Sequence, residues 1–286
     1  MGWSKNILVK IGLGLLAFYA LFLLSKNVSK SFYLLNQDKI NLVIFQKEPV
    51  FIAYDLKDKN SYLINFYPDL KVQLPGGYGE YRLGGLLKLS ELDKKPEIIQ
   101  RTFSNLTKSL VDFYFYPDQA EIYFGKNNNE KANRISFFGI LRSKSNASFF
   151  ERILVYFLLL RQDKSQQLSS VDMIKSSADY QGYFYKESLR KEKINAQLVY
   201  KKSYPTALNL SKILEGEGIR IVDILQKSNE EPSDKQGKCL IVQSSTSQTA
   251  NYLARYFKCD LKTSQQTGVY DLVFNLNNLE DSWEIN

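Results

Sequence analysis

The feature that most constrains this chain is an apolar stretch near its N-terminus, Ile7 to Leu24 (ILVKIGLGLLAFYALFLL). As a helix it would be about 27 Å long, close to the thickness of the hydrocarbon core of a bilayer. Its one charged residue, Lys10, lies near the N-terminal end, where the ammonium can reach the lipid head groups, and Trp3 stands where interfacial aromatic residues are common. The stretch therefore predicts a transmembrane helix.

A cleaved signal peptide is the alternative interpretation of the same stretch. The apolar run is longer than a typical signal-peptide core, no A-x-A cleavage site follows it, and no cysteine that could carry a lipid lies nearby. These features favour an uncleaved signal anchor. Lys5 and Lys10 precede the apolar core, and Lys26 and Lys30 follow it. Together with the α-amino group, this distribution favours a cytoplasmic N-terminus and an extracytoplasmic C-terminal part.

The rest of the chain has the composition of folded domains. Hydrophobic residues make up 44% of the sequence and charged residues 24%. The net charge of +8 is concentrated before residue 205, which suits an anionic lipid surface or a phosphorylated ligand. Nucleic acid is the rival partner, but the chain has no cluster of four or more basic residues. We expect the partners to be the bilayer, possible envelope proteins and a polymer or lipid of the envelope, with no nucleic acid.

Histidine is absent, and cysteine occurs only at Cys239 and Cys259. Ser-His-Asp and Cys-His catalysis are therefore excluded, as are metal sites that contain histidine. Two cysteines alone cannot form a zinc site. They could form one disulfide if the domain is extracytoplasmic, or remain as two buried thiols, since Cys239 opens a predicted strand and Cys259 closes a predicted helix.

Hydrophobic periodicity predicts an α/β (α+β) fold with a mixed sheet and helices after the anchor. The predicted strands are 40–45, 50–54, 62–66, 111–116 and 121–124, and the predicted helices are 83–92, one starting near Pro96, and 147–161. The last helix is strongly apolar, but its uncharged core from Ile153 to Leu160 is too short to span a bilayer. It is either a buried core helix, the favoured interpretation, or one wall of a groove for a lipid tail.

A second pattern of strands and helices begins at Ile194. Strands are predicted at 194–200, 219–225, 239–243 and 270–276, with a possible short strand at 260–263, and helices at 206–215 and 248–257. Two β-α-β halves joined by a loop indicate a small β-α-β-β-α-β module of the split-βαβ kind. Nothing in it resembles a catalytic constellation. The predicted boundaries are cytoplasmic N-terminus and anchor 1–25, stalk 26–38, first domain 39–162, connection 163–192 and C-terminal domain 193–286.

Four segments of the C-terminal part, 194–200, 207–222, 249–257 and 270–276, follow a recognisable order of strands and helices. The first two are similar to a V-x-V-x-N strand, a helix and an L-x-x-x-G-[FY]-x-V segment, which open a domain of the LytR-CpsA-Psr family of envelope proteins, and the last two resemble the second half of that domain. Tyr200-Lys201-Lys202 stands where that pattern has its asparagine and first glycine. This is the pattern of the LytR C-terminal domain, over about 85 residues.

Residues 41–161 resemble the catalytic domain of the same family. The matching segments are 48–53 at R-x-D-T-I-[LM], 65–72 at S-I-P-R-D-[ST]-x-V, 81–86 at K-[IL]-N-x-[AS]-[YF], and 141–144 with 149–152 at V-R-x-R…D-x-x-R-x-x-R-Q. In that family, arginines hold the pyrophosphate of a polyprenyl-linked glycan, Mg²⁺ sits on carboxylates, and the lipid lies in an apolar groove. The resemblance implies Arg82, Arg142, Lys144 and Arg152 as pyrophosphate or lipid ligands, and Glu48 and Asp69 as Mg²⁺ ligands.

The catalytic pattern is incomplete, and the domain is shorter than in the family. Pro68 replaces the arginine before Asp69, Glu48 replaces an aspartate, and Gln46 or Lys47 stands at another arginine position. No residue is therefore assigned as catalytic. The resemblance implies an anchored envelope protein with a degenerate catalytic domain that binds a polyprenyl-phosphate-linked or cell-wall polymer or acts as a scaffold. The alternatives are an active glycopolymer phosphotransferase and a purely structural protein-interaction module.

Overall fold

The computed structural model describes residues 9–12, 14–15, 18–19, 38–125, 137–160, 164–169, 181–227, 238–265 and 268–285. Its three short pieces before residue 20 are helical. Most of the predicted anchor and all but the last residue of the predicted stalk lie outside these ranges. Within them, we find no helix whose length and apolar character would let it cross a membrane. The transmembrane helix therefore stays a prediction.

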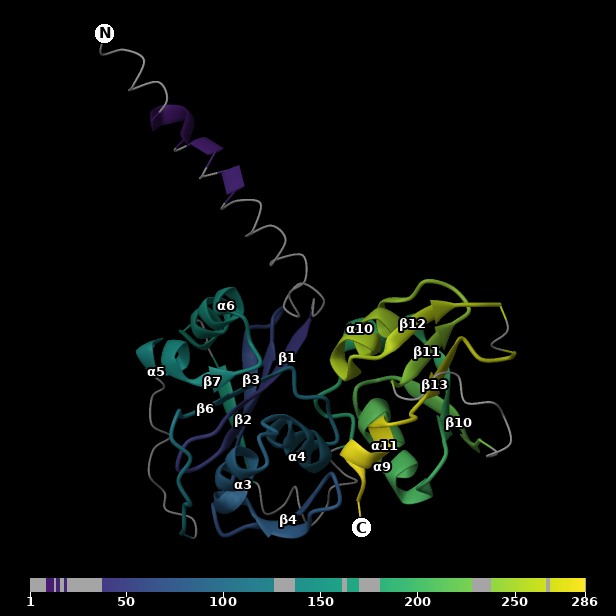
Figure 1. Cartoon of the computed structure of the whole chain (residues 1–286), viewed down its shortest axis with the longest axis horizontal. Coiled ribbons are helices and arrows are strands. Elements are labelled where there is room, and N and C mark those ends of the chain that lie inside the picture. Colours follow the sequence, from purple (N-terminus) through teal and green to yellow (C-terminus); the bar gives the residue numbers. More distant parts are fainter. Residues whose placement is uncertain are drawn as a thin grey trace.

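Two lobes make up the body of the molecule (Figure 1). The first lobe, residues 38–169, contains a six-stranded sheet in the order β7-β6-β1-β2-β3-β8 and a separate β4–β5 hairpin. The strands are β1 (Lys39–Ile44), β2 (Val50–Asp55), β3 (Asn60–Asn65), β4 (Lys71–Leu74), β5 (Gly79–Arg82), β6 (Phe113–Tyr116), β7 (Lys144–Ser145) and β8 (Lys164–Ser169). The predicted mixed α/β character is confirmed.

Strand β1 is buried along its whole length, because helices cover both faces of the sheet. Its side chains alternate: Ile40, Leu42 and Ile44 belong to one apolar core, and Val43 and Phe45 belong to another. The core around Val43 also contains residues of η1 (Leu83–Gly85), α3 (Leu86–Leu92) and α4 (Glu97–Thr107). The core around Ile44 contains residues of α5 (Phe137–Arg142) and α6 (Phe149–Leu160).

Two segments of the first lobe differ from the sequence prediction. The strand predicted at 121–124 is wrong: the segment forms no ladder, and its backbone contact is one hydrogen bond from Tyr123 N to Gly84 O at 3.0 Å. Ile122 and Phe124 are exposed there, so their alternation does not reflect a buried sheet face. Conversely, β8 is not predicted, because its sequence KSQQLS is polar. It pairs in parallel with β3 at the sheet edge.

The second lobe, residues 195–285, has a five-stranded sheet in the order β10-β9-β13-β11-β12. Its elements are β9 (Asn195–Tyr200), α9 (Tyr204–Gly216), β10 (Arg220–Gln226), β11 (Leu240–Gln243), α10 (Gln248–Phe257), β12 (Asp260–Thr263), β13 (Leu272–Asn275) and α11 (Leu279–Trp283). The predicted strands and helices are confirmed, but the split-βαβ topology is wrong. In each β-α-β unit the two parallel strands are direct neighbours, β9 with β10 and β11 with β12. Strand β13 joins the units between β9 and β11.

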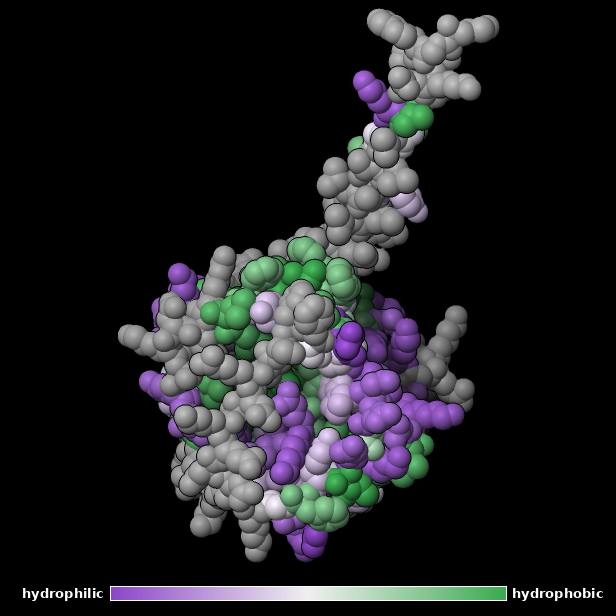
Figure 2. Space-filling view, turned by 90° about the vertical axis from the view of Figure 1, so that its left-hand side faces the viewer, coloured by the Kyte–Doolittle hydropathy of each residue, from purple (hydrophilic) through white to green (hydrophobic). Residues whose placement is uncertain are grey.

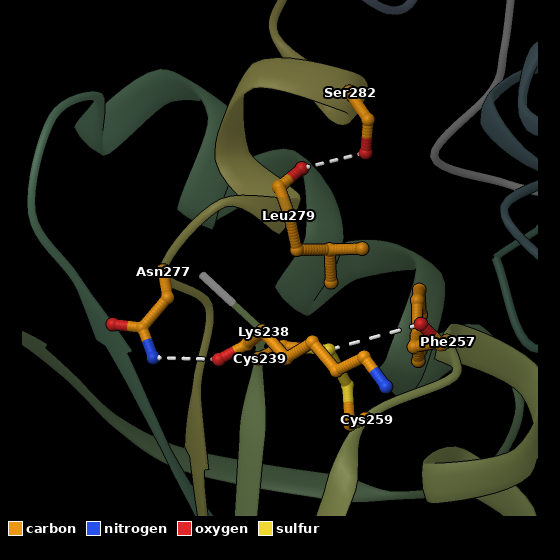
Figure 3. Close-up of a disulfide and its surroundings, with 7 residues drawn as sticks. All are labelled: Lys238, Cys239, Phe257, Cys259, Asn277, Leu279 and Ser282. Atoms are coloured by element: carbon orange, nitrogen blue, oxygen red, sulfur yellow. Dashed lines mark hydrogen bonds between the residues drawn. A yellow bond between two sulfur atoms is a disulfide. The ribbon is translucent and has the colours of Figure 1, made fainter. Parts of the chain in front are cut away.

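A disulfide links Cys239 and Cys259 in the second lobe, with a Cα–Cα distance of 4.8 Å (Figure 3). Cys239 immediately precedes β11, and Cys259 lies between α10 and β12. These two parallel strands are neighbours, so the cysteines meet at the same end of the strand pair. Of the two alternatives left open by the sequence, the structure has the disulfide.

The lobes are joined by a buried cluster of polar and charged side chains. Lys186, just before helix α8 (Glu187–Glu192), places Nζ 3.1 Å from Asp112 Oδ2 of the first lobe and 3.4 Å from Glu217 Oε2 of the second. Glu217 Oε1 accepts hydrogen bonds from Ser109 Oγ at 2.7 Å and from Leu110 N. Because all three charged side chains are buried, separation of the lobes would expose or unpair them.

Candidate functional site

The structure places the six predicted site residues in separate groups. Arg142, Lys144 and Arg152 lie together on the segment that runs from α5 through β7 into α6. Asp69 and Arg82 lie together beside the β4–β5 hairpin, where Arg82 Nη1 is 3.9 Å from Asp69 Oδ1. Glu48 lies in the turn between β1 and β2. Arg142 and Arg82 line two different pockets that share no lining residue.

The Arg142 pocket has a volume of about 250 Å³. It is formed by the ends of β1 and β6, the Pro117-Asp118 turn and helix α5, and its apolar lining includes Ile44, Phe45, Phe115, Pro117 and Ile140. Strands β1 and β6 are parallel, with Ile44 opposite Phe115, so both carboxyl ends open into the pocket. The carboxyl ends of parallel strands are the usual place for a ligand in an open α/β sheet.

Arg142 supplies the cationic group of this pocket. Its side chain is exposed at the end of α5 and makes no ion pair with any residue in the ranges described above. Lys144, two residues later, is engaged: its Nζ lies 3.0 Å from Asp118 Oδ1 and donates to Asp118 O at 2.9 Å. The hydrogen bond to Asp118 raises the pKa of Lys144. Of these two cations, Arg142 is the one left to meet an anionic ligand.

Arg152 is used by the backbone rather than by the pocket. Its Nε donates to Ala147 O at 3.2 Å, and its Nη1 donates to Leu141 O at 2.9 Å and also to Ser143 O. The Leu141 carbonyl belongs to the last turn of α5, where helix geometry leaves acceptors without partners, and the Ser143 and Ala147 carbonyls lie between α5 and α6. Arg152 therefore fixes the turn that carries Arg142, which makes it a positioning residue.

The Arg82 pocket is formed by the β4–β5 hairpin and the segment 121–125. Its volume is about 290 Å³, and its lining includes Lys71, Tyr81 and Arg82 together with Ile122 and Phe124. Glycine at position 84 allows the two segments to approach, because a Cβ there would lie 2.1 Å from Tyr123 O. Asp69 Oδ2 accepts a hydrogen bond from Gly125 N at 3.3 Å. Glu80 also lines the hollow and lies 3.8 Å from Lys71 Nζ, so the Asp69–Arg82 pair borders a second hollow with both charges and an aromatic rim.

The residues predicted to hold Mg²⁺ meet only part of what such a site needs. Asp69 Oδ1 is buried and accepts no hydrogen bond from the described residues, which leaves a lone pair for a cation. However, Arg82 Nη1 lies 3.9 Å from the same oxygen. In the part of the chain with assigned structure, no three Cys, Asp or Glu residues are grouped so that they could hold a metal ion. The Mg²⁺ site at Glu48 and Asp69 stays a prediction.

Gln46 and Asp118 line the Arg142 pocket but were not predicted as site residues. Asp118 lies in the connection between the predicted strands 111–116 and 121–124, and Gln46 stands at an altered position of a family motif. The available signal was their position: Gln46 directly follows one predicted strand, and Asp118 lies two residues after another. The sequence could not indicate that these two strands are parallel neighbours, because β1 and β6 are separated by the hairpins and by α3 and α4.

Comparison with known proteins finds likeness only among solved structures. No protein-family model matches the chain, and no curated protein matches it. TagT of Bacillus subtilis is similar with 11% identity and a TM-score of 0.33, over 47% of this chain and 79% of that one. TagU of B. subtilis is similar with 11% identity and a TM-score of 0.32, over 50% of this chain and 97% of that one.

A third match is the LytR-CPS2A-psr family protein YwtF (TagT) with bound octaprenyl pyrophosphate lipid. It has 9% identity and a TM-score of 0.33, over 47% of this chain and 78% of that one. The structural neighbours are thus LytR-CpsA-Psr proteins, the family that the sequence resembles. With identities near 10% and TM-scores near 0.33, neither an activity nor a site follows for this chain.

Proposed function

We propose that this chain is a cell-envelope protein that binds a polyprenyl-phosphate-linked ligand, with the phosphate group at Arg142. One observation carries the proposal: Arg142 is a cation without an ion-pair partner among the described residues, on a pocket with an apolar lining. A guanidinium group pairs well with phosphate oxygens, because its N–H groups form a planar fork. A phosphate joined to a hydrocarbon chain combines the two properties that the pocket can recognise.

The size of the pocket limits what it encloses. A volume of about 250 Å³ is slightly below the roughly 300–1,000 Å³ of pockets that enclose drug-sized ligands. It would hold the phosphate end and the first carbons of the lipid. The rest of the lipid would lie outside, along α6, whose Phe149, Phe157 and Leu160 are exposed. Figure 2 views the side on which α5 and α6 lie and shows hydrophobic surface at its upper end.

The same proposal includes a single N-terminal membrane anchor and extracytoplasmic lobes. The apolar stretch from Ile7 to Leu24 and the lysines on either side of it support this topology. The Cys239–Cys259 disulfide also supports it, because structural disulfides persist mainly in oxidising compartments. In this arrangement the anchor is residues 1–25 and the stalk is residues 26–38. The ligand-binding domain is residues 39–162, the connection is residues 163–192, and the C-terminal domain is residues 193–286.

Transferase activity is proposed to be weak or absent. Pro68 stands at a position where the family has an arginine, and Arg152 donates to backbone carbonyls. Loss of one donor to a transition-state charge typically costs roughly 10²–10³ in rate. The alternative, an active glycopolymer phosphotransferase, is favoured by one observation: the Asp69–Arg82 pair beside a second pocket. A purely structural scaffold is the third possibility.

Lipid recovery would test the proposal. The full chain would be purified from membranes in an uncharged detergent and extracted with organic solvent, and the extract would be analysed by mass spectrometry. We expect a polyprenyl phosphate with the natural chain and much less with Arg142→Ala at equal protein amounts. Equal recovery from both would contradict the assignment. Release of polyprenyl phosphate from a lipid-linked glycan with Mg²⁺ would instead support the active transferase.

A further inference from the structure

A third hollow, larger than the Arg142 and Arg82 pockets, lies where α8 meets the second lobe. Its volume is about 540 Å³. Four of its lining residues are cationic: Arg190, Lys191, Lys193 and Arg220. Glu187 is the one acidic lining residue. We call this hollow the α8 cleft. Neither the sequence prediction nor the proposed function uses it.

The carboxylate of the α8 cleft is already paired. Glu187 Oε1 lies 2.7 Å from Lys191 Nζ, and Glu187 Oε2 lies 2.9 Å from Lys57 Nζ. These two lysines lower the pKa of Glu187 to about 2, so its carboxylate is ionised at neutral pH. Two ammonium groups, those of Lys191 and Lys57, balance its single negative charge. Lys193 and Arg220 are exposed and make no ion pair with a residue of the described ranges. The cleft therefore has a cationic excess.

Backbone and ring contacts give the α8 cleft a fixed shape. The Arg190 guanidinium carbon lies 4.8 Å from the centre of the Tyr185 ring, and Lys39 Nζ lies 5.4 Å from the same ring. Gly218 has a φ of +98°, and a Cβ there would lie 2.9 Å from Arg190 Cβ. Glycine thus lets the start of β10 approach α8, which brings Arg220 close to Arg190 and Lys193.

We infer that the α8 cleft binds a ligand with several phosphate groups, at a site separate from the Arg142 pocket. Closely spaced cations on two elements suit an anion with more than one charge, and guanidinium groups favour phosphate oxygens. The phosphate could belong to a soluble or polymeric compound or to a lipid head group. A lipid is possible because Lys39, the first residue of β1, lies over the Tyr185 ring of the cleft, and the predicted membrane anchor precedes β1 in the chain.

Inorganic tripolyphosphate is a suitable probe, because it carries several phosphates and no lipid. Binding to the full chain in dodecyl maltoside would be measured by titration calorimetry. We expect the Lys193→Gln/Arg220→Gln variant to bind at least about tenfold more weakly, since each charged hydrogen bond is worth roughly a factor of ten or more. The matched control is Lys238→Gln/Lys262→Gln, which removes the same charge from exposed positions near β11 and β12.

The control variant should stay within about twofold of the natural chain. Arg142 is unchanged in both double variants, and tripolyphosphate has no hydrocarbon chain, so the cleft can pass this test even if the proposed lipid site fails its own. Equal weakening of both double variants, or no binding by the natural chain, would overturn the inference. Unchanged thermal unfolding of both variants would show that they fold.

A second titration identifies the source of the phosphate. Detergent micelles containing phosphatidylglycerol or phosphatidylcholine would be added before tripolyphosphate. If the anionic lipid alone weakens binding to the natural chain but not the residual binding of Lys193→Gln/Arg220→Gln, the cleft accepts lipid head groups. If neither lipid competes, it takes a soluble or polymeric phosphate. Both results support a phosphate site.

Discussion

Lys186 Nζ lies 3.4 Å from Glu217 Oε2 where the two lobes meet, and neither side chain is more than 1% exposed. Asp112 Oδ2 lies 3.1 Å from the same ammonium, so two carboxylates share one cation. Burial alone would lower the pKa of Lys186, but Asp112 and Glu217 reverse the effect and raise it. Burial raises the pKa of Glu217, opposed by Lys186 and reinforced by Asp112. The ammonium is therefore charged and holds the lobes together.

Replacement of Lys186 by methionine should strongly destabilise the chain. It leaves two buried carboxylates without a cation, and loss of one partner from a buried pair typically costs about 3–5 kcal/mol. The free energy of unfolding would be measured by urea titration. The Lys186→Met/Glu217→Gln variant removes one of the stranded carboxylates, so it should lose less than the single variant. A double variant that is less stable than the single one would contradict the shared-cation account.

The deficit of Lys186→Met should also depend on pH. Burial raises the folded-state pKa of Glu217, and loss of the opposing Lys186 ammonium should raise it further. Between the unfolded-state pKa and the higher folded-state pKa of Glu217, the folded state binds more protons than the unfolded state. Stability therefore increases as pH falls through this window. Urea titrations near pH 8 and pH 5 should therefore show a smaller difference from the natural chain at the lower pH. A difference independent of pH would indicate that lost packing, not charge, causes the defect.

Loss of the Cys239–Cys259 disulfide should lower stability without changing the fold. The bridge joins residues 20 positions apart. Closure of a loop of this length is worth about 3 kcal/mol in the chain-entropy account. Thermal unfolding with and without a reductant should show a lower midpoint in the reduced chain. Cys239→Ala/Cys259→Ala should unfold at a similar lower temperature and should not respond to reductant; a response would mean that the reductant acts elsewhere.

Substitution of Arg152 should lower the stability of the fold, because its guanidinium group binds backbone carbonyls. Arg152→Ala leaves the carbonyls of Leu141, Ser143 and Ala147 without this donor. We expect a loss of about 1–3 kcal/mol in the free energy of unfolding. Arg152→Lys keeps the charge but not the planar fork, so most of the loss should remain. Full recovery with lysine would show that charge, not the fork, matters at this position.

Local patterns predicted most elements of the fold. The apolar run 40–45 corresponds to β1, which is buried on both faces, and the apolar spacing after Pro96 corresponds to α4, which buries one face. The polar strand β8 gave no such signal, because an edge strand is held mainly by backbone hydrogen bonds. The segment 121–124 gave a false one, because its apolar residues are exposed.

The site was harder to predict than the fold, since it depends on contacts between distant residues. Lys186 lies in an ordinary charged stretch, and nothing local marks it as buried. Asp112 was more visible, as a charge inside the apolar run 111–116. For Arg142, Lys144 and Arg152, sequence proximity indicated a common location, but not which cation is free. That distinction depends on Asp118 and on the carbonyls at the end of α5.

Affinity for farnesyl pyrophosphate, a short soluble prenyl pyrophosphate, tests the central claim most directly. It would be measured for the full chain in uncharged detergent, for Arg142→Ala, and for Lys262→Ala as a control at an exposed lysine in the second lobe. The Arg142 pocket predicts at least about tenfold weaker binding for Arg142→Ala, from loss of a charged hydrogen bond, and a change within about twofold for Lys262→Ala. Equal affinity of Arg142→Ala and the natural chain would contradict ligand binding at this pocket.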